Sequence, residues 1–218
     1  MTARIRTARL RPGTPRSLPG DESGATLVEF AIVVSLFLLI LFGMVDFGRL
    51  AYHVVTTERA THAAARLAAV RPPACAGVPD TNLRDTAGTG TYDYGTSCNA
   101  GGAICDNPGP VTCLGSAANA TASEVWAVVQ TTLPPEATIS NIRFTYSYDP
   151  NLGFLGGPYV PVVTVELEDV AFDFVTPLSA LAVVAGVAPG ASAIPGSLTL
   201  PSQSASTPGE DLAQGENG

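Results

Sequence analysis

The feature that most constrains this chain is an apolar run near its N-terminus. Residues 30–45 read FAIVVSLFLLILFGMV, sixteen residues in which the interruptions are Ser35 and Gly43. Extended back to Ala25 the run has twenty-one residues, and an α-helix needs about twenty to cross a hydrocarbon core of ~30 Å. A buried core helix is the alternative, but no other segment is suited to enclosing this run on all sides. The sequence therefore predicts a membrane-spanning helix.

Charge is distributed unevenly about the apolar run. Residues 1–71 carry a balance of +4 and residues 72–218 a balance of −12, which together give the net charge of −8. Because arginine-rich flanks stay in the cytoplasm, we expect a cytoplasmic N-terminus and an extracytoplasmic remainder. An acidic chain without lysine also disfavours nucleic-acid binding. The five arginines before the run are Arg4, Arg6, Arg9, Arg11 and Arg16.

All four cysteines follow the apolar run. They fall in a segment rich in glycine, proline and asparagine, and no C-x2-C pair suggests a zinc site. An even number of cysteines in an oxidising compartment predicts two disulfides. Three pairings are possible, and the sequence does not choose among them. The candidates are Cys75, Cys98, Cys105 and Cys113.

A glycine and a carboxylate stand where the apolar run begins. Gly24 closes a polar leader, and Glu29 follows five residues later among apolar neighbours. An ionisable group in this zone is costly and needs a partner. A cut after Gly24 would give Ala25 a free amine, and Ala25 and Glu29 share one helix face as i and i+4. Glu29 could then neutralise this amine or that of a neighbouring subunit. The alternative is a carboxylate that snorkels to the headgroups.

The boundary residues resemble a known family. Residues 24–50, GATLVEFAIVVSLFLLILFGMVDFGRL, followed by AAARLAAVRP, resemble the TadE-like pseudopilins of tight-adherence (Flp) pilus systems. The acidic residue, Phe-Gly and arginine at 46–49 follow the family's pattern at the end of its helix. Ser35 departs from a frequent proline, and Phe30 replaces the tyrosine of the major pilins. The second departure favours the minor, TadE-like branch.

The resemblance implies several expectations. A prepilin peptidase would cleave between Gly24 and Ala25, and the mature chain would insert into the bacterial cytoplasmic membrane as a single-pass protein. Its partners would be the membrane, the peptidase and other pilins or pseudopilins of one system. Its function would lie in assembly of a tight-adherence pilus or a related secretion system. An uncleaved single-pass anchor with an extracytoplasmic binding domain is the alternative function.

Enzymatic chemistry is not expected. His53 and His62 are nine residues apart on the expected helix and do not share a face, so they form no catalytic pair. The acidic cluster of residues 166, 168, 169 and 173 could in principle hold calcium, but a solvated sheet face is the favoured interpretation. We expect no catalytic residue, no metal site and no cofactor.

The remaining pattern predicts an α+β chain: a long transmembrane helix continuing into a pilin-like extracytoplasmic domain with a short helix and a small antiparallel sheet. The expected segments are a leader at 1–24, a transmembrane helix at 25–46, its extracytoplasmic continuation at 47–71, a cysteine-containing loop at 72–120, a small α+β domain at 121–205 and a disordered tail at 206–218.

Individual elements follow from periodicity and capping signals. One stripe of the continued helix carries Leu50, Val54, Thr57, Thr61, Ala64 and Ala68, whose shrinking side chains suit close approach of a sheet or helix. A solvated stalk is the alternative. Thr121 and Glu124 match a capping box before a short helix. Alternation predicts strands near 142–148 and 163–167, a change of parity at 168–169, and a short helix at 178–188.

Overall fold

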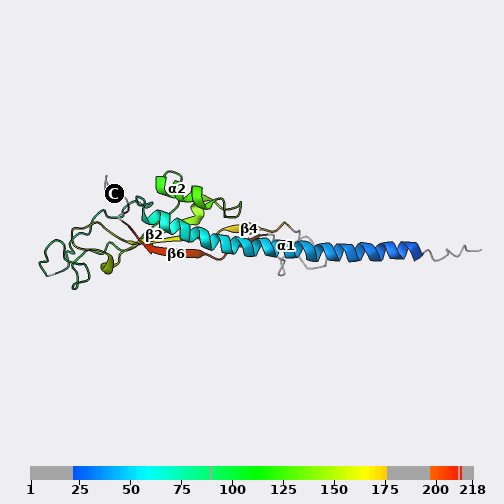
Figure 1. The fold of residues 1–218 in the computed structure, drawn as a ribbon, viewed down its shortest axis with the longest axis horizontal. Coiled ribbons are helices and arrows are strands. Elements are labelled where there is room, and N and C mark those ends of the chain that lie inside the picture. The colour runs from blue at the N-terminus through cyan, green and yellow to red at the C-terminus, as the bar shows by residue number, and fades with distance from the viewer. Residues whose placement is uncertain (1–21, 89, 176–196, 211, 213–218) are drawn as a thin grey trace, which may run out of the picture. The chain divides into compact units, whose positions relative to one another are not determined.

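The computed structural model describes residues 22–88, 90–175, 197–210 and 212 (Figure 1). The chain divides into two compact units, Met1–Phe42 and Gly43–Gly218. Helix α1, Glu22–Ala69, begins in the first unit and ends in the second.

The described part of the first unit is the beginning of α1. From Gly24 to Phe42 every residue except the half-buried Val34 is exposed. The large apolar side chains are among them, for example Phe30 at 69% and Val33 at 65% exposure. Apolar surface on this scale requires lipid or protein to cover it. The predicted all-round apolar helix is confirmed.

In the second unit α1 is buried along the predicted stripe. Thr57, Thr61 and Ala64 are each 1% exposed, and Ala68 is fully buried. Small side chains let the neighbouring backbone approach closely, so this half of the helix packs on a sheet. The solvated-stalk alternative is therefore wrong. The helix ends at Ala69, before the two prolines at 72 and 73, which cannot continue it.

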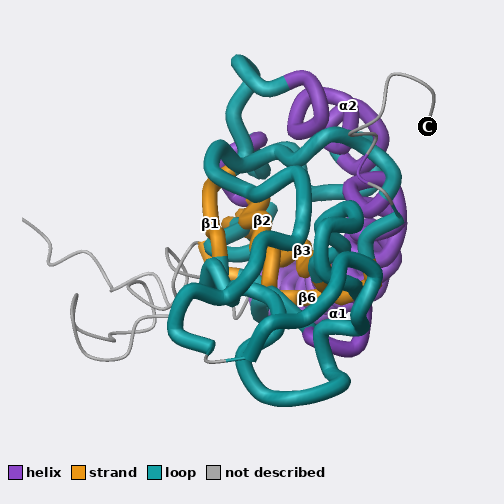
Figure 2. The backbone as a smooth tube through the Cα atoms, turned by 90° about the vertical axis from the view of Figure 1, so that its left-hand side faces the viewer, coloured by secondary structure: helices purple, strands orange, loops and turns teal. Residues whose placement is uncertain are grey.

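A four-stranded antiparallel sheet provides the packing surface. Its order is β1-β2-β3-β6, and the strands lie beside α1 (Figure 2). Alternation in β2 and β3 directs Phe144, Tyr146, Val163 and Val165 into the core, where all four are fully buried. The strands are β1 (Val111–Leu114), β2 (Ile142–Ser147), β3 (Val162–Leu167) and β6 (Gln203–Pro208).

A smaller sheet of two strands packs on an earlier part of α1. Strand β4, Ala171–Asp173, pairs antiparallel with β5, Ser197–Thr199. Phe172 is 1% exposed within a cluster that includes Leu50 of α1. The expected change of parity before β4 is confirmed, because Asp169 adopts a left-handed φ of 53° and turns the chain there.

The short helix α2, Ala120–Val129, is present, but its expected cap is wrong. Asn119 is the N-cap, and its side chain accepts a hydrogen bond from Ala122 N at 2.9 Å. Thr121 instead donates to the carbonyl of Pro72 at 2.7 Å, and Glu124 pairs with Arg71. Both residues therefore fasten α2 to the end of α1, which short-range capping rules do not foresee.

Two segment boundaries also need correction. The cysteine-containing loop at 72–120 includes strand β1, whose pairing with β2 is long-range. The tail from residue 206 begins inside β6, which pairs with β3 as far as Pro208, and Leu212 is buried. The expected helix at 178–188 lies outside the described residues. Two short 3-10 helices complete the described elements, η1 (Ile139–Asn141) and η2 (Pro150–Leu152).

Two disulfides form, as predicted. Cys75 bonds to Cys113 and ties the chain just after α1 to strand β1. Cys98 bonds to Cys105 and closes a small loop around the buried side chains of Ile104 and Leu155. Of the three pairings that the sequence left open, the structure has the one in which the first cysteine bonds to the last and the second to the third.

Candidate functional site

The expected cleavage position lies within the first turn of α1. The helix begins at Glu22, three residues earlier than expected, so the Gly24–Ala25 bond is helical. A Cβ added to Gly24 would meet no atom within 4 Å, and Gly24 does not adopt a left-handed φ. Glycine lowers helix stability by about 1 kcal/mol relative to alanine. Nothing in the described fold requires glycine at this position.

Glu29 lies on the exposed apolar part of α1. Its neighbours Val28 and Phe30 are 57% and 69% exposed, and Glu29 itself is exposed. The helical register from Ala25 to Glu29 is continuous, which places both residues on one face. The carboxylate thus stands on a surface that only lipid or another apolar helix can cover.

The helix is long and apolar enough to cross a membrane. Over Gly24–Ala69 its most apolar stretch has a mean hydropathy of 2.7, and none of that stretch is buried within the chain. A core helix of a soluble protein would be mostly buried, and here no such cover exists among the described residues. The single N-terminal apolar helix therefore indicates single-pass membrane anchoring.

A buried acid follows directly after the apolar run. Asp46 is 1% exposed, and it accepts hydrogen bonds from Arg49 at 3.2 Å and from the backbone N–H of Val175 at 3.3 Å. A buried carboxylate needs such partners, because burial without them is costly. Asp46 thus fastens the chain after β4 to α1. The sequence pointed to Asp46 only through the family pattern and gave no sign of its burial.

Aromatic side chains pack around the junction, which is the place where the chain after β4 contacts α1 beside Asp46. Phe174 lies between Phe47 and Phe172, with ring centroids at 6.2 and 5.4 Å. The guanidinium carbon of Arg49 is 5.3 Å from the centroid of the Phe172 ring, within cation–π range. His53 packs on the same ring at 5.7 Å. The junction is thus a packed cluster, and long-range contacts create it.

His53 of α1 packs against Phe172 of the small sheet. It is half-buried, and its Nδ1 is buried without a hydrogen-bond partner among the described residues. Burial and the nearby Arg49 lower the pKa of His53, while Glu136 partly opposes them. The imidazole is therefore held neutral more readily than an exposed histidine. His62 is exposed.

Two buried tyrosines anchor loops to the large sheet. The hydroxyl of Tyr146 accepts a hydrogen bond from Ala74 N at 2.9 Å, and burial raises the pKa of Tyr146. Burial also raises the pKa of Tyr159 to about 12, and its ring stacks on Tyr148 at 6.4 Å. Neither phenol is prepared for proton transfer near neutral pH, so both are structural.

The acidic cluster does not assemble into a cation site. Glu168 forms an ion pair with Arg143, and Glu166 lies opposite Arg143 in the sheet register. Among the described residues no group of three or more histidine, cysteine or acidic side chains could hold a metal ion. Where Glu166 and Glu168 lie, the geometry is that of a partly solvated, charge-paired surface.

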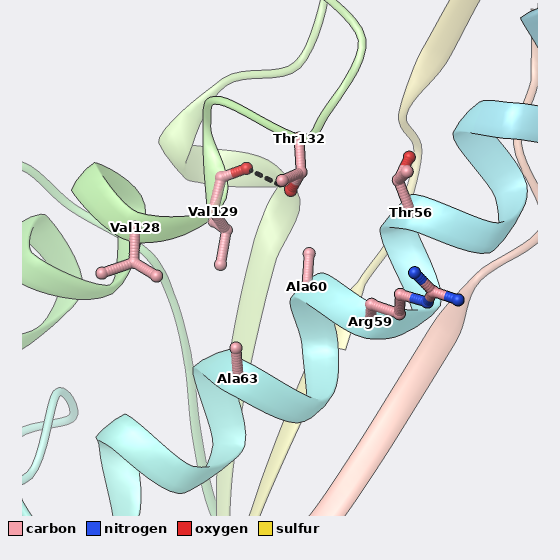
Figure 3. A pocket seen from close by; sticks show the side chains of 7 residues that line it. All are labelled: Thr56, Arg59, Ala60, Ala63, Val128, Val129 and Thr132. Atoms are coloured by element: carbon pink, nitrogen blue, oxygen red, sulfur yellow. Dashed lines mark hydrogen bonds between the residues drawn. The ribbon is translucent and has the colours of Figure 1, made fainter.

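An open groove of about 240 Å³ separates α1 from α2. Ala60 and Ala63 of α1 face Val129 across it, and the carbonyl of Val129 accepts a hydrogen bond from the hydroxyl of Thr132 at 2.8 Å (Figure 3). Its lining is apolar apart from Arg59 and the two threonines, and it contains no acid–base pair. The groove offers contact surface rather than chemistry. Its lining residues are Thr56, Arg59, Ala60, Ala63, Val128, Val129 and Thr132.

Comparison with known proteins identifies the membrane segment. The family model described as TadE-like protein matches residues 24–66, which confirms the resemblance found in the sequence. The match begins at Gly24, covers Glu29 and Asp46, and ends three residues before the end of α1. No curated protein matches the chain, and no solved structure does. TadE-like proteins are structural components of pilus assembly. The matching segment therefore implies a membrane protein related to tight-adherence pilus systems.

Proposed function

We propose that this protein is a TadE-like minor pseudopilin that acts in assembly of a tight-adherence (Flp-type) pilus or a related secretion system. A prepilin peptidase cuts it after Gly24, and the mature chain begins at Ala25. The observation that carries the proposal is the register of Gly24, Ala25 and Glu29 at the start of an exposed apolar helix, inside the TadE-like match.

Gly24 supports processing because neither its backbone conformation nor the space around it requires glycine. Open space surrounds the Gly24 Cβ position, so another residue would fit the helix at least as well. Glycine also makes the first helical turn easier to unwind, by about 1 kcal/mol, and a peptidase must reach the Gly24–Ala25 bond. Recognition of the cleavage site by the peptidase would account for a glycine at this position.

Glu29 supports assembly because its surroundings are apolar. A carboxylate within the hydrocarbon zone is costly unless paired, and cleavage creates an amine at Ala25, one helical turn away. Glu29 neutralises that amine in its own chain or in a neighbouring pilin. Assembly with other pilins or pseudopilins is then favoured, because the neighbouring helix covers the apolar surface as well as the charge.

The topology follows from charge. Five arginines before the apolar run keep the leader in the cytoplasm, and the acidic, disulfide-bonded remainder lies outside. The protein acts without catalysis, metal or cofactor, through contacts with the membrane, the peptidase and other pilins. A C-terminal fusion to a reporter that works only outside the cytoplasm tests the orientation, and activity of a cytoplasmic reporter at that position would contradict it.

Mass measurement of the mature N-terminus tests processing. The expected chain begins at Ala25, and a Gly24→Leu variant keeps its leader because the peptidase needs a small residue before the cut. Gly43→Leu is the matched control, since Gly43 lies in the same helix and also has open space around its Cβ position. Processing of Gly24→Leu at the normal rate would contradict the assigned cut.

Substitution of the carboxylate separates assembly from processing. Glu29→Ala and Glu29→Gln should both be cut and inserted, yet both should be absent from complexes pulled down with other pilins, because neither can neutralise the Ala25 amine. Gel mobility reports processing, and co-purification reports assembly. Normal co-purification of Glu29→Gln would reduce Glu29 to a boundary residue that snorkels.

The second candidate function is an uncleaved single-pass anchor that displays an extracytoplasmic binding domain. One observation favours it: α1 is already helical from Glu22 across the Gly24–Ala25 bond, as a permanent anchor would be. An intact leader on the mature protein would decide for this candidate.

A further inference from the structure

We propose that the second unit makes its own contact with the lipid surface through Phe47, Phe174 and Val175, here called the membrane collar. The inference rests on the membrane anchoring contained in the proposed function, and it is independent of processing after Gly24 and of pilus assembly. All three residues belong to the second unit, at the junction of α1 with the end of the small sheet.

Contacts show that β4 runs along α1 toward the apolar run. Phe172 lies against His53 and Arg49, with centroid distances of 5.7 and 5.3 Å. Two residues later Phe174 lies against Phe47 at 6.2 Å. The backbone N–H of Val175 then reaches Asp46 at 3.3 Å. From Phe172 in β4 to Val175 just after it, each successive contact is therefore made with an earlier residue of α1.

Helix geometry sets the depth of these contacts. The apolar run ends at Val45, immediately before Asp46. A headgroup layer is about 5–7 Å thick on each side of the hydrocarbon core, which corresponds to roughly four or five residues of helix at 1.5 Å each. Residues 46–50 are thus expected at headgroup level. Phe174 and Val175, which contact residues 47 and 46, are held at the same level.

The collar presents apolar surface where a soluble domain would hide it. Phe47 is 60% exposed and Val175 is 76% exposed, and Phe174 is half-buried. In interfacial amphipathic helices, phenylalanine and other large apolar side chains lie at the boundary between headgroups and acyl chains. Of the two acids adjacent to the collar, Asp46 is buried and bonded to Arg49, and Asp173 is exposed.

A lipid surface is the favoured occupant, because the collar directly follows the apolar run of α1. Phe47 follows the last residue of the apolar run by two positions, so the exposed surface of the collar extends that of the run along the same chain. The chain that leaves the collar, residues 176–196, contains no charged residue, and no charge in it opposes approach to a bilayer. A second copy of the chain is the competing occupant, and it would protect the collar from quenchers in the lipid and in the water alike.

Tryptophan fluorescence in proteoliposomes tests the collar with the full-length chain. Trp126, the one tryptophan of the sequence, is replaced by phenylalanine, and a tryptophan is then introduced by Val175→Trp. Tyr94→Trp is the matched control, because Tyr94 is 78% exposed and lies in the loop region of the same unit. Vesicles with bromine on the acyl chain near the headgroup quench from the lipid, and iodide quenches from the water.

The expected result is a blue-shifted emission from Val175→Trp that bromolipid quenches strongly and iodide quenches weakly, with the opposite order for Tyr94→Trp. Iodide quenching of Val175→Trp without bromolipid quenching would overturn the collar and leave the anchor intact. Protection from both quenchers would mean a protein neighbour, and would also overturn the lipid assignment. Failure of the chain to float with the vesicles would overturn the anchor itself and the collar with it.

Discussion

The two halves of α1 belong to one helix but differ in which kind of side chain is exposed and which is buried. Residues 24–42 carry large apolar side chains that the chain leaves exposed, whereas residues 57–69 carry mostly small side chains that the sheet buries. Leu36 is 58% exposed and Ala68 is fully buried. Exposure thus runs opposite to side-chain size, because the described chain leaves the first half uncovered and packs strands of its own domain on the second half.

The difference teaches that hydrophobicity alone does not locate a core. Leucine and phenylalanine gain most from leaving water, and in a soluble domain they would be inside. Apart from Asp46, the buried residues of the helix are alanine and threonine, whose small side chains let strands β2 and β3 lie close to the helix backbone. Four perturbations separate the two halves of the helix, from the largest expected effect to the smallest.

The Cys75–Cys113 disulfide should contribute most to the buried half, because it holds the chain after α1 on β1. A Cys75→Ala/Cys113→Ala variant should lose about 4 kcal/mol of unfolding free energy, and Cys98→Ala/Cys105→Ala about 2 kcal/mol, because the enclosed loops differ in length, 38 against 7 residues. Denaturant titration of the full chain in detergent measures both. Equal losses would contradict the loop-entropy account.

A charge placed in the exposed half should affect insertion and leave the domain folded. Leu38→Arg puts an arginine near the centre of the apolar run, which costs about 2.5–3.5 kcal/mol on insertion scales. Alkaline carbonate extraction should release more of this variant. Ala63→Arg is the control on the exposed face of the second half. If both variants are extracted alike, the assigned span is wrong.

A larger side chain in the buried half should have the reverse effect. Ala64 is 1% exposed, so Ala64→Leu should lower the free energy of unfolding by about 1–3 kcal/mol through overpacking. Membrane retention should not change. Ala63→Leu, one residue earlier and exposed, should be nearly neutral in the same titration. A neutral Ala64→Leu would mean that the sheet does not pack on this face.

The smallest effect concerns His53, at the junction between the halves. Its pKa is lowered in the folded chain by burial and Arg49, so the unfolded chain binds the proton more readily. Stability should therefore fall as the pH drops below about 6.5, and the loss should stop at the folded pKa. His53→Gln should remove this part of the pH dependence, while the exposed His62→Gln should retain it. Thermal unfolding between pH 7 and 5 provides the measurement.

By itself the sequence determined the elements that depend on local periodicity and composition. The apolar run, the buried stripe of α1 and strands β2 and β3 were predictable because each repeats its burial pattern within a few residues. The number of disulfides followed from cysteine count and topology. The motif at Gly24 and Glu29 was also visible locally, as was the resemblance later matched over residues 24–66.

Only the tertiary structure decided the features that join distant segments. The pairing of Cys75 with Cys113 depends on β1 lying beside β2, and β6 pairs with β3 from residues more than thirty positions away. Thr121 binds Pro72 instead of capping its helix. Asp46 is buried because the chain after β4 returns to α1 129 positions later. Such contacts gain their energy from surfaces brought together by folding, and no short window of sequence contains both partners.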